Sequence, residues 1–451
     1  MRAANLISLY TVSKIKTWKL VNILLSGGIN KMKDETKCLH AGYKPKNAEP
    51  RVMPIVQSTT YVYDSTEEVA SVFDQPMKSL IYSRFANPTV MAVENKIAEL
   101  EGGVGAMCTS SGQAATLLSI LNLCEAGDSF ISTPEIYGGT VNLFSFTFKK
   151  MGIECIFVDP ESSDEEISKA FKPNTKAVFG ETIANPALTV FDIERFARIA
   201  HEHNVPLIVD NTFATPVLCK PFDFGADIVV HSTSKYMDGH AVQVGGVIVD
   251  SGKFDWKKGN FPGINEPDES YHGISYTETY GNMAYIVKAR MQLMRDFGVY
   301  PAAHSAFLLN LGLETLAVRM KQYCENAMTV AKYLESSDKI ESVKYPGLES
   351  DKCYELGKKY LKGCSGVISF VIKGGKEAAM KFMNSLELAS NEVHVADIRT
   401  CVLHPASETH RQLTDEQLVA AGIDSGMVRF SVGLENVDDI IADLEKGLSA
   451  I

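Results

Sequence analysis

The chain has 451 residues, of which 45% are hydrophobic and 22% charged, the balance of an ordinary globular protein with room for two or three domains. Its formal net charge of −11 argues against a nucleic-acid surface, which requires a clustered basic face. No apolar run reaches the roughly 18 residues that span a bilayer, so no membrane segment is expected. The nine cysteines are scattered, without CxxC pairs or zinc-ligand spacing, which predicts reduced thiols and no metal site.

Residues 1–31 differ in character from the rest of the chain. They contain no acid, and their charged residues are Arg2, Lys14, Lys16, Lys19 and Lys31. A targeting peptide has a similar charge pattern, but the apolar stretch here is short and no Ala-x-Ala site follows it. We therefore interpret residues 1–31 as a disordered or artefactual extension, with a mitochondrial-type presequence as the alternative.

Residues 32–90 form the next segment. They are rich in proline, tyrosine and threonine and show no helical periodicity. We expect an extended N-terminal arm without a hydrophobic core of its own.

From about residue 100, short β-type runs alternate with helical stretches, which predicts a mainly parallel sheet with helices on both faces. Asp192 is the expected N-cap of one helix, and the apolar run over 206–209 is typical of a strand covered on both faces. The expected strands are 104–109, 155–158, 177–181, 206–209, 228–231 and 244–249; the expected helices are 113–124, 163–171 and 192–203. Together they predict a large α/β domain over 91–300.

Residues 251–280 carry aromatic residues among glycines and charges, and we expect an ordered insertion in the large domain. From about Pro301, a long helical pattern over 306–333 leads to short strands at 367–372 and 428–432 and a last helix over 437–448. This mixture predicts a smaller α+β C-terminal domain over 301–451.

The sharpest local pattern is a single lysine among hydroxyls, His231-Ser232-Thr233-Ser234-Lys235-Tyr236, at the end of an expected strand. Ligands of open α/β sheets bind at the carboxyl ends of strands. A lysine there can form a Schiff base with a carbonyl cofactor, and neighbouring hydroxyls can hold a phosphate. Taken alone, the same pattern is typical of a surface loop.

Three further patterns lie at strand–helix junctions. Asp210 ends an apolar strand, where a carboxylate requires a positive partner such as a protonated pyridine nitrogen, although aspartate is also common in turns. Ser111 and Gly112 open a helix whose N–H groups suit a phosphate, although an ordinary serine N-cap has the same sequence. Tyr137 precedes two glycines, and its ring can stack on a flat cofactor or fill the core.

Two other phosphate-binding signatures fail. Gly103-Val104-Gly105 begins a dinucleotide fingerprint, but Cys108 occupies the place of the third glycine. No G-x-x-x-x-G-K-[ST] occurs in the sequence. The sequence therefore supports neither a nicotinamide enzyme nor a P-loop NTPase.

The four patterns follow the order phosphate loop, aromatic, carboxylate, lysine, and with them residues 35 to 450 resemble a known family. This is the family of Cys/Met-metabolism enzymes that use pyridoxal 5′-phosphate (PLP). The motifs that carry the resemblance are Tyr82-Ser83-Arg84-Phe85-Ala86-Asn87-Pro88-Thr89, Ser110-Ser111-Gly112, Tyr137-Gly138-Gly139, Glu181-Thr182-Ile183-Ala184-Asn185-Pro186, Asp210-Asn211-Thr212, the Lys235 segment, and Val428-Arg429-Phe430-Ser431-Val432-Gly433. The resemblance implies a PLP-dependent transferase fold, like that of aspartate aminotransferase.

The resemblance also implies roles in binding the cofactor. Lys235 would link covalently to PLP and then move protons, Asp210 would pair with the pyridinium nitrogen, and Tyr137 would stack on the ring and assist proton transfer. The phosphate would be bound by the N–H groups of Gly112 and Gln113 and the hydroxyls of Ser232 and Ser234.

Further residues would act at the edges of the same site. By resemblance, Tyr82 and Arg84 would reach the phosphate in a neighbouring subunit, and Asn185 would lie near the cofactor and the substrate carboxylate. Arg429 would grip that carboxylate as a bidentate fork. Arg399 would either add a positive group near the substrate or form a structural ion pair.

Within the family, the chain resembles the O-acetylhomoserine sulfhydrylases. Gly139 stands where methionine γ-lyases have a cysteine, and the insertion from Phe254 to Gly273 and the run from His394 to Leu413 look like those of sulfhydrylases. The implied reaction joins O-acetyl-L-homoserine and sulfide to give L-homocysteine and acetate. Whether the sulfur donor is sulfide or a thiol stays open. The alternatives are methionine γ-lyase activity, cystathionine γ-synthase-type chemistry, and a PLP-binding sensor or scaffold without turnover.

The resemblance also carries expectations about assembly and location. It implies a cytoplasmic homotetramer built from active-site dimers. No nucleic-acid or membrane partner is expected.

Overall fold

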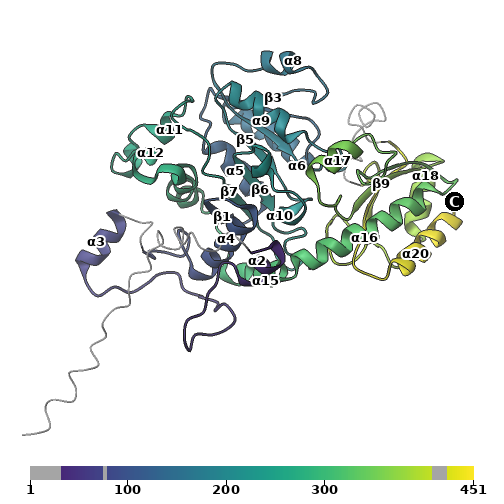
Figure 1. The fold of residues 1–451 in the computed structure, drawn as a ribbon, viewed down its shortest axis with the longest axis horizontal. Helices are drawn as coiled ribbons and strands as arrows, with labels where there is room; N and C mark the ends of the chain where they lie inside the picture. The colour runs from purple at the N-terminus through teal and green to yellow at the C-terminus, as the bar shows by residue number, and fades with distance from the viewer. Residues whose placement is uncertain (1–31, 75–78, 409–423) are drawn as a thin grey trace, which may run out of the picture.

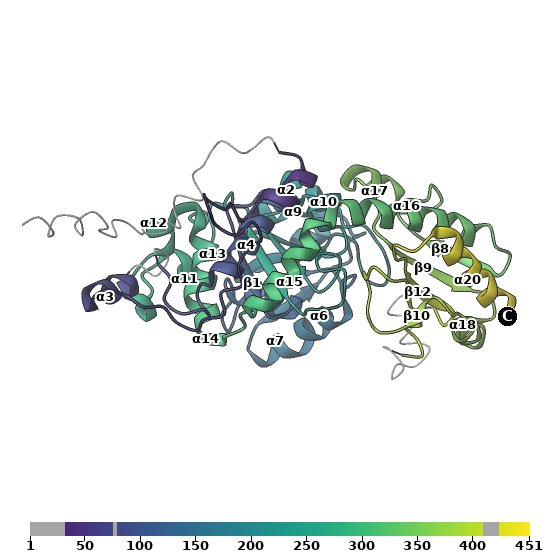
Figure 2. The same cartoon turned by 90° about the horizontal axis from the view of Figure 1, so that it is seen from below.

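The computed structural model describes residues 32–74, 79–408 and 424–451, which form two lobes joined by a long helix (Figure 1, Figure 2). The predicted extension over residues 1–31 lies outside the described residues. So does the end of the sulfhydrylase-like run, from Thr409 to Leu413.

A seven-stranded sheet forms the centre of the large lobe in the described chain, in the order β1-β7-β6-β5-β4-β2-β3. Its strands are β1 (Gly105–Thr109), β2 (Ser129–Ser132), β3 (Glu154–Phe157), β4 (Thr175–Glu181), β5 (Leu207–Asp210), β6 (Ile228–Ser232) and β7 (Gly246–Asp250). Strands β2 to β6 pair in parallel, and β7 runs antiparallel between β6 and β1. The predicted mainly parallel sheet is confirmed, and β2 is the strand that the sequence patterns missed.

Both faces of this sheet are buried, because neighbouring residues along each strand enter opposite hydrophobic cores. Val209 and Val229 face the core that contains the interiors of α4 (Pro88–Glu101) and α9 (Ile193–Glu202). Ile208 and Ile228 face the core that contains those of α5 (Gly112–Leu121) and α13 (Ala284–Lys288). The prediction of helices on both faces is confirmed. The other helices of this part are α6 (Gly138–Asn142), α7 (Phe148–Lys150), α8 (Asp164–Lys169) and α10 (Thr215–Leu218).

Local signals set the helix starts. The Ser163 hydroxyl and the Glu166 carboxylate cap α8 reciprocally, as in a capping box. Asp192 caps α9 by accepting a hydrogen bond from the Arg195 N–H at 3.4 Å, as predicted from the sequence.

The arm over residues 32–90, expected to be extended, is extended only in part, because it also contains helices. It contains α2 (Asp34–His40) and α3 (Thr66–Asp74), and its last residues begin α4. Helix α2 packs against α4 and the helices that follow the sheet, whereas α3 lies at the outer end of the large lobe (Figure 1, Figure 2). Acidic residues in the first turn of each helix match the helix dipole, and each helix is short and buries few side chains.

The aromatic insertion over 251–280 is ordered and packs onto the large lobe. Trp256 is buried and stacks on Tyr285, with ring centroids 5.3 Å apart and planes 6° from parallel. The helices of the insertion and of the segment after it are α11 (Pro262–Asn265), α12 (Tyr276–Tyr280) and α14 (Arg295–Phe297).

Helices α15 (Ala303–Glu314) and α16 (Leu316–Glu335) connect the lobes (Figure 2). Leu316, Met320 and Tyr323 of α16 belong to a core of the large sheet. Val330 and Leu334, further along the same helix, belong to the core of the small lobe. The division between the two cores therefore falls inside α16.

The small lobe is built on a five-stranded sheet in the described chain, in the order β10-β11-β12-β9-β8. Its strands are β8 (Ile340–Lys344), β9 (Val367–Ile372), β10 (Ser390–Asn391), β11 (Cys401–Leu403) and β12 (Met427–Ser431), and its helices are α17 (Tyr354–Tyr360), α18 (Gly375–Asn384) and α20 (Val437–Ser449). All neighbouring strands are antiparallel except β10 and β11. The predicted α+β character is confirmed.

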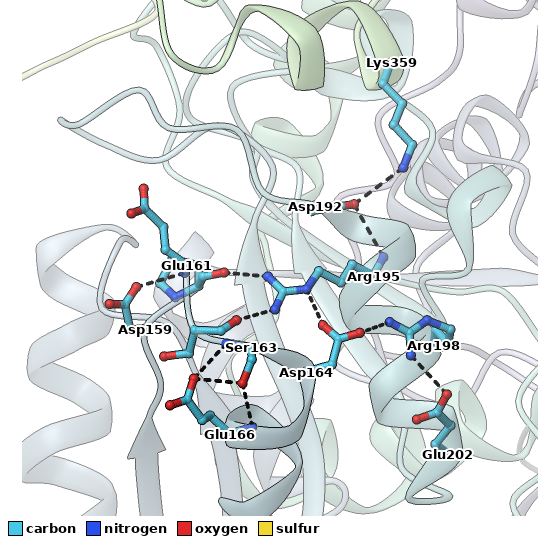
Figure 3. Close-up of polar contacts among 12 residues, drawn as sticks. Asp159, Glu161, Ser163, Asp164, Glu166, Asp192, Arg195, Arg198, Glu202 and Lys359 are labelled. Atoms are coloured by element: carbon cyan, nitrogen blue, oxygen red, sulfur yellow. Dashed lines mark hydrogen bonds and ion pairs between the residues drawn. The ribbon is translucent and has the colours of Figure 1, made fainter.

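A polar cluster ties the small lobe to the large one (Figure 3). The Arg195 guanidinium binds Asp164 at 2.6 Å and the Pro160 carbonyl at 2.7 Å. Lys359 of α17 approaches Asp192, the cap of the Arg195 helix, to 3.6 Å (Figure 3). These exposed pairs add little energy individually, but they hold α8, α9 and α17 in one arrangement.

Candidate active site

The carboxyl ends of four large-lobe strands meet at one edge of the sheet. The register pairs Glu181 with Asp210, and both Thr109 and Ser232 with Gly246. The ends of β4, β5, β6 and β1 thus lie side by side, and three of the four sequence patterns follow these strands directly. This is the edge at which open α/β sheets bind ligands.

Lys235 lies in the turn after β6, at the interface of the lobes. The Gly239 N–H donates to the Lys235 carbonyl at 2.7 Å, which closes the turn. The Lys235 amine lies 3.4 Å from Nδ1 of His394, a residue of the small lobe. Burial and the nearby Arg429 charge lower the pKa of Lys235 to about 8, so a substantial fraction of the amine is neutral near physiological pH.

Asp210 ends β5 with one carboxylate oxygen engaged. Its Oδ1 accepts hydrogen bonds from the Thr212 N–H at 3.0 Å and from the Thr212 hydroxyl. Within the part of the chain that the structure describes, Oδ2 has no hydrogen-bond partner. Asp210 is half-buried, and desolvation by the surrounding protein raises its pKa above the ordinary range. A cation placed at Oδ2 would offset that cost.

The start of α5 presents free N–H groups to the same edge. Ser111 caps the helix through a hydrogen bond from the Ala114 N–H at 3.1 Å. In the described chain the N–H groups of Gly112 and Gln113 have no acceptor, and neither does the Ser232 hydroxyl. A Cβ at Gly112 would lie 2.6 Å from Ser232 Cβ, so only glycine allows this close approach. Ser234 differs, because its hydroxyl bonds to the Gly245 N–H and carbonyl.

Tyr137 stands just before α6 and is held from two sides. Its N–H donates to Glu181 Oε2 at 2.6 Å, and the Gln113 side chain donates to the Gly139 carbonyl at 3.0 Å. The Tyr137 side chain remains 48% exposed, so its ring is available to a ligand. Burial and the neighbouring Asp210 charge raise the pKa of Glu181 well above its ordinary value.

Arg429 on β12 is buried and points back from the small lobe to the large one. Its guanidinium donates to Asn185 Oδ1 at 3.2 Å and to the His394 carbonyl at 3.0 Å. Burial lowers the pKa of Arg429, although an arginine remains charged. The structure thus brings Arg429 and Asn185 together at the His394 segment that also approaches Lys235.

Of the two possibilities for Arg399, a positive group near the substrate or a structural ion pair, the structure contains the ion pair. Its Nε and Nη2 bind the two oxygens of Asp397 at 2.9 and 3.1 Å, and Nη2 also donates to the His240 carbonyl. The Arg399 side chain is 65% exposed, whereas that of Asp397 is 2% exposed. The arginine therefore neutralises a buried carboxylate.

Tyr82 and Arg84 lie in the arm. Arg84 donates to the Arg295 carbonyl and stands over the Tyr82 ring, with its Cζ atom 5.5 Å from the ring centroid. Within the described residues, neither makes a hydrogen bond to another predicted site residue. Tyr82 is 39% exposed.

Four polar residues at or near this edge had no predicted role. Glu181 carries the signal that singled out Asp210, an acid at the end of a buried strand. His231 and Glu101 form a fully buried pair at 2.6 Å behind Asp210. His394 approaches Lys235 across a separation of 159 residues, which no local pattern can predict.

In the described chain no group of three or more His, Cys, Asp or Glu side chains could hold a metal ion. All nine cysteines are free thiols. No described helix has the length and apolar character needed to cross a membrane.

Known proteins resemble this chain over nearly its whole length. An O-acetyl-L-homoserine sulfhydrylase of Leptospira meyeri is 44% identical over 430 residues, which cover 93% of this chain and 97% of that protein. A homocysteine synthase of Schizosaccharomyces pombe is 46% identical over 419 residues, which cover 92% of this chain and 97% of that protein.

A solved structure shares the fold. A Campylobacter jejuni protein described as an O-acetylhomoserine (thiol)-lyase has a TM-score of 0.89 and 36% sequence identity, over 93% of this chain and 100% of that one. Its crystal structure contains an N′-pyridoxyl-lysine-5′-monophosphate. Residues 35–449 match the family described as Cys/Met metabolism PLP-dependent enzyme. The chain therefore belongs to the PLP-dependent enzymes of Cys/Met metabolism.

Proposed function

We propose that this protein converts O-acetyl-L-homoserine and sulfide into L-homocysteine and acetate. The observation that carries the proposal is the meeting of Lys235, Asp210, Tyr137 and Arg429 at one sheet edge, in a chain whose similar relatives bear the names of this activity.

The residues at the edge fit PLP. The N–H groups of Gly112 and Gln113 and the Ser232 hydroxyl lack acceptors within the described chain and match a phosphate. Asp210 Oδ2 matches a protonated ring nitrogen, and the exposed Tyr137 ring matches a stacked aromatic. Ser234 would have to exchange or share its bonds to Gly245 to bind the phosphate.

PLP, when bound, supplies an electron sink that makes the protons on Cα and Cβ of an amino acid acidic. The protein then has three tasks in the proposed reaction. Lys235 would hold the cofactor, and its amine, when free, would accept the Cα proton of the substrate. Asp210 keeps the ring nitrogen protonated. Tyr137, at the mouth of the site, assists proton transfer as acetate leaves Cγ and sulfide adds there.

Arg429 and Asn185 would orient the substrate. A planar guanidinium binds a carboxylate through two parallel hydrogen bonds, which fixes the rotation of the substrate around Cα. The Cα–H bond is thereby held in the direction from which Lys235 can take the proton, and decarboxylation is disfavoured. The bond from Arg429 to Asn185 at 3.2 Å holds the guanidinium at this place.

Tyr82 and Arg84 are proposed to serve the phosphate of a second subunit, in a cytoplasmic homotetramer built from active-site dimers. Tyr82 is exposed, and neither side chain is hydrogen-bonded to the Lys235 region of its own chain, as far as the structure describes it. Sedimentation and activity of a mixture of Lys235→Ala and Arg84→Ala chains test this, because one complete site forms only in the mixed dimer.

The reaction is tested with PLP-loaded protein and O-acetyl-L-homoserine, with and without sulfide. Homocysteine that appears only with sulfide, with little 2-oxobutyrate, supports the proposal. Abundant 2-oxobutyrate from methionine or homocysteine identifies a methionine γ-lyase. Cystathionine formed with cysteine as the thiol identifies a cystathionine γ-synthase-type enzyme. Bound PLP without turnover of any of these compounds indicates a binding protein.

A further inference from the structure

His394 contacts both proposed working groups of the site. Its Nδ1 lies 3.4 Å from Lys235 Nζ, and its carbonyl accepts a hydrogen bond from Arg429 at 3.0 Å. The histidine comes from the small lobe, between β10 and β11, whereas Lys235 belongs to the large lobe. Packing of the lobes therefore places one imidazole against the proposed base and beside the proposed carboxylate anchor.

The charges around His394 keep its imidazole neutral. Lys235, Arg429 and Arg399 face it with positive charge, and Asp397 faces it with negative charge. Burial, followed by the Lys235 charge, lowers the pKa of His394 to about 4. At physiological pH the ring is thus a neutral hydrogen-bond acceptor on one nitrogen and a donor on the other.

The surroundings also select the tautomer. If Nδ1 accepts from Lys235, the ring proton lies on Nε2, which is buried without a hydrogen-bond partner among the described residues. The Asp397 Oδ2 atom lies 4.0 Å from Nε2 and favours a proton there. The Arg399 N–H and Nε both donate to Asp397, at 2.8 and 2.9 Å, and hold that carboxylate in place.

We propose that His394 is the positioning residue of Lys235: its neutral imidazole accepts a hydrogen bond from Lys235 Nζ and holds the freed amine ready to take the substrate Cα proton. This rests on the proposed role of Lys235 as the base. In that step the Cα proton passes to the nitrogen lone pair of Lys235, and the electron pair of the Cα–H bond stays with the substrate, delocalised into the bound cofactor.

A neutral acceptor suits this task better than a carboxylate does. A carboxylate beside Lys235 would favour the ammonium form, which has no lone pair for a proton. An apolar side chain would leave the amine without an acceptor and free to rotate away. The imidazole orients the amine without adding the charge that would keep it protonated.

The test isolates the proton transfer from the rest of the reaction. PLP-loaded protein is given L-2-aminobutyrate in D2O, and loss of the Cα proton is followed by NMR across a range of pH. This amino acid has the carbon chain of homoserine but no leaving group, so neither acetate nor sulfide takes part. Three variants are compared with the parent: His394→Leu, His394→Asn and His394→Asp.

Each variant has a distinct expected result. His394→Leu slows exchange by roughly 10- to 100-fold, since the base loses its orientation. His394→Asn keeps a neutral acceptor and stays much closer to the parent. His394→Asp shifts the rising limb of the pH profile upward by about one unit or more, because the carboxylate raises the pKa of Lys235.

Cofactor absorbance and thermal unfolding establish that each variant is folded and loaded. If His394→Leu does not fold, the pH profile of His394→Asp decides. Parent-like rates and pH profiles in the folded variants overturn the proposal. The two proposals can fail separately. If exchange in the variants responds as expected but the parent makes no homocysteine, the proposed function is contradicted and the role of His394 is retained.

Discussion

The Glu181 carboxyl group accepts a hydrogen bond from the Tyr137 N–H at 2.6 Å, and so connects the end of β4 to the loop that carries the exposed ring of Tyr137. Burial and the Asp210 charge raise the pKa of Glu181 well above its ordinary value, which favours the neutral carboxylic acid. The acceptor is then its carbonyl oxygen.

Glu181→Gln should therefore leave the unfolding free energy and kcat/KM nearly unchanged, since an amide has the shape of a protonated carboxyl group and keeps a carbonyl acceptor. Glu181→Leu leaves the Tyr137 N–H without its partner and should cost about 1 kcal/mol or more of unfolding free energy. Urea unfolding and kcat/KM of both variants check this. A glutamine variant as damaged as the leucine variant would show that the negative charge itself is required.

Gly139→Cys should displace the Tyr137 ring. A Cβ at Gly139 would lie 2.5 Å from Tyr137 Cε1, closer than a carbon contact allows, so one of the two must move. We expect kcat/KM for homocysteine formation to fall roughly 10- to 100-fold, as for other small misplacements in active sites. Gly263→Ala is the matched control, because the nearest atom to its Cβ is 3.5 Å away. Equal activity of both variants would contradict the expectation.

Arg429→Lys should raise KM for O-acetyl-L-homoserine more than it lowers kcat. Lysine keeps the charge but loses the two-pronged hydrogen bonding and the contact with Asn185, which together correspond to roughly 10-fold or more in KM. Arg198→Lys, in an exposed pair with Asp164, provides the control. Steady-state kinetics distinguish the two, and an unchanged KM for Arg429→Lys would remove this residue from substrate binding.

Asp250→Asn should stabilise the protein at alkaline pH. Burial raises the pKa of Asp250 from 3.8 to about 7, and its Oδ2 is buried without a partner in the described chain. The folded state therefore retains a proton that the unfolded chain has lost, so this stabilising contribution is complete below about pH 4 and is lost as pH rises to about 7. The Asp250→Asn variant does not undergo this loss. Its unfolding free energy, relative to that of the parent, should therefore rise by about 2–3 kcal/mol between pH 5 and pH 8.

Unfolding free energies at the two pH values, with exposed Asp255→Asn as the control, measure this gain. A difference between Asp250→Asn and the parent that is the same at pH 5 and pH 8 would show that Asp250 is ionised in the folded protein at both.

The sequence predicts the large lobe well because its signals are local. Alternating apolar runs and the Asp192 cap are read within a few residues of one another, and most of the predicted strands and helices of the sheet agree with the structure to within two or three residues. Helices α2 and α3 escape prediction because each packs few side chains. Strand β2 escapes because its four residues begin and end with serine.

The same difference between local signals and long-range packing applies to the residues of the site. Asp210 ends β5 and Lys235 lies in the turn directly after β6, so the sheet topology places both at the same edge. Glu181 satisfies the same rule and was overlooked, whereas the contact of His394 with Lys235 depends on how the lobes pack across 159 residues. The pairing of Arg399 with Asp397 was left open by the sequence because it depends on which way the guanidinium points.

Helix α16 gives three buried hydrophobic residues to the core of the large lobe and four to the core of the small lobe, and this constrains how such chains can recombine. A crossover at Thr315, between α15 and α16, would place α16 and the core of the large lobe in different parents, and a crossover after α16 would do the same for the core of the small lobe. A chimaera of two relatives should therefore retain activity only when the α16 residues that face each core suit the parent that supplies that lobe.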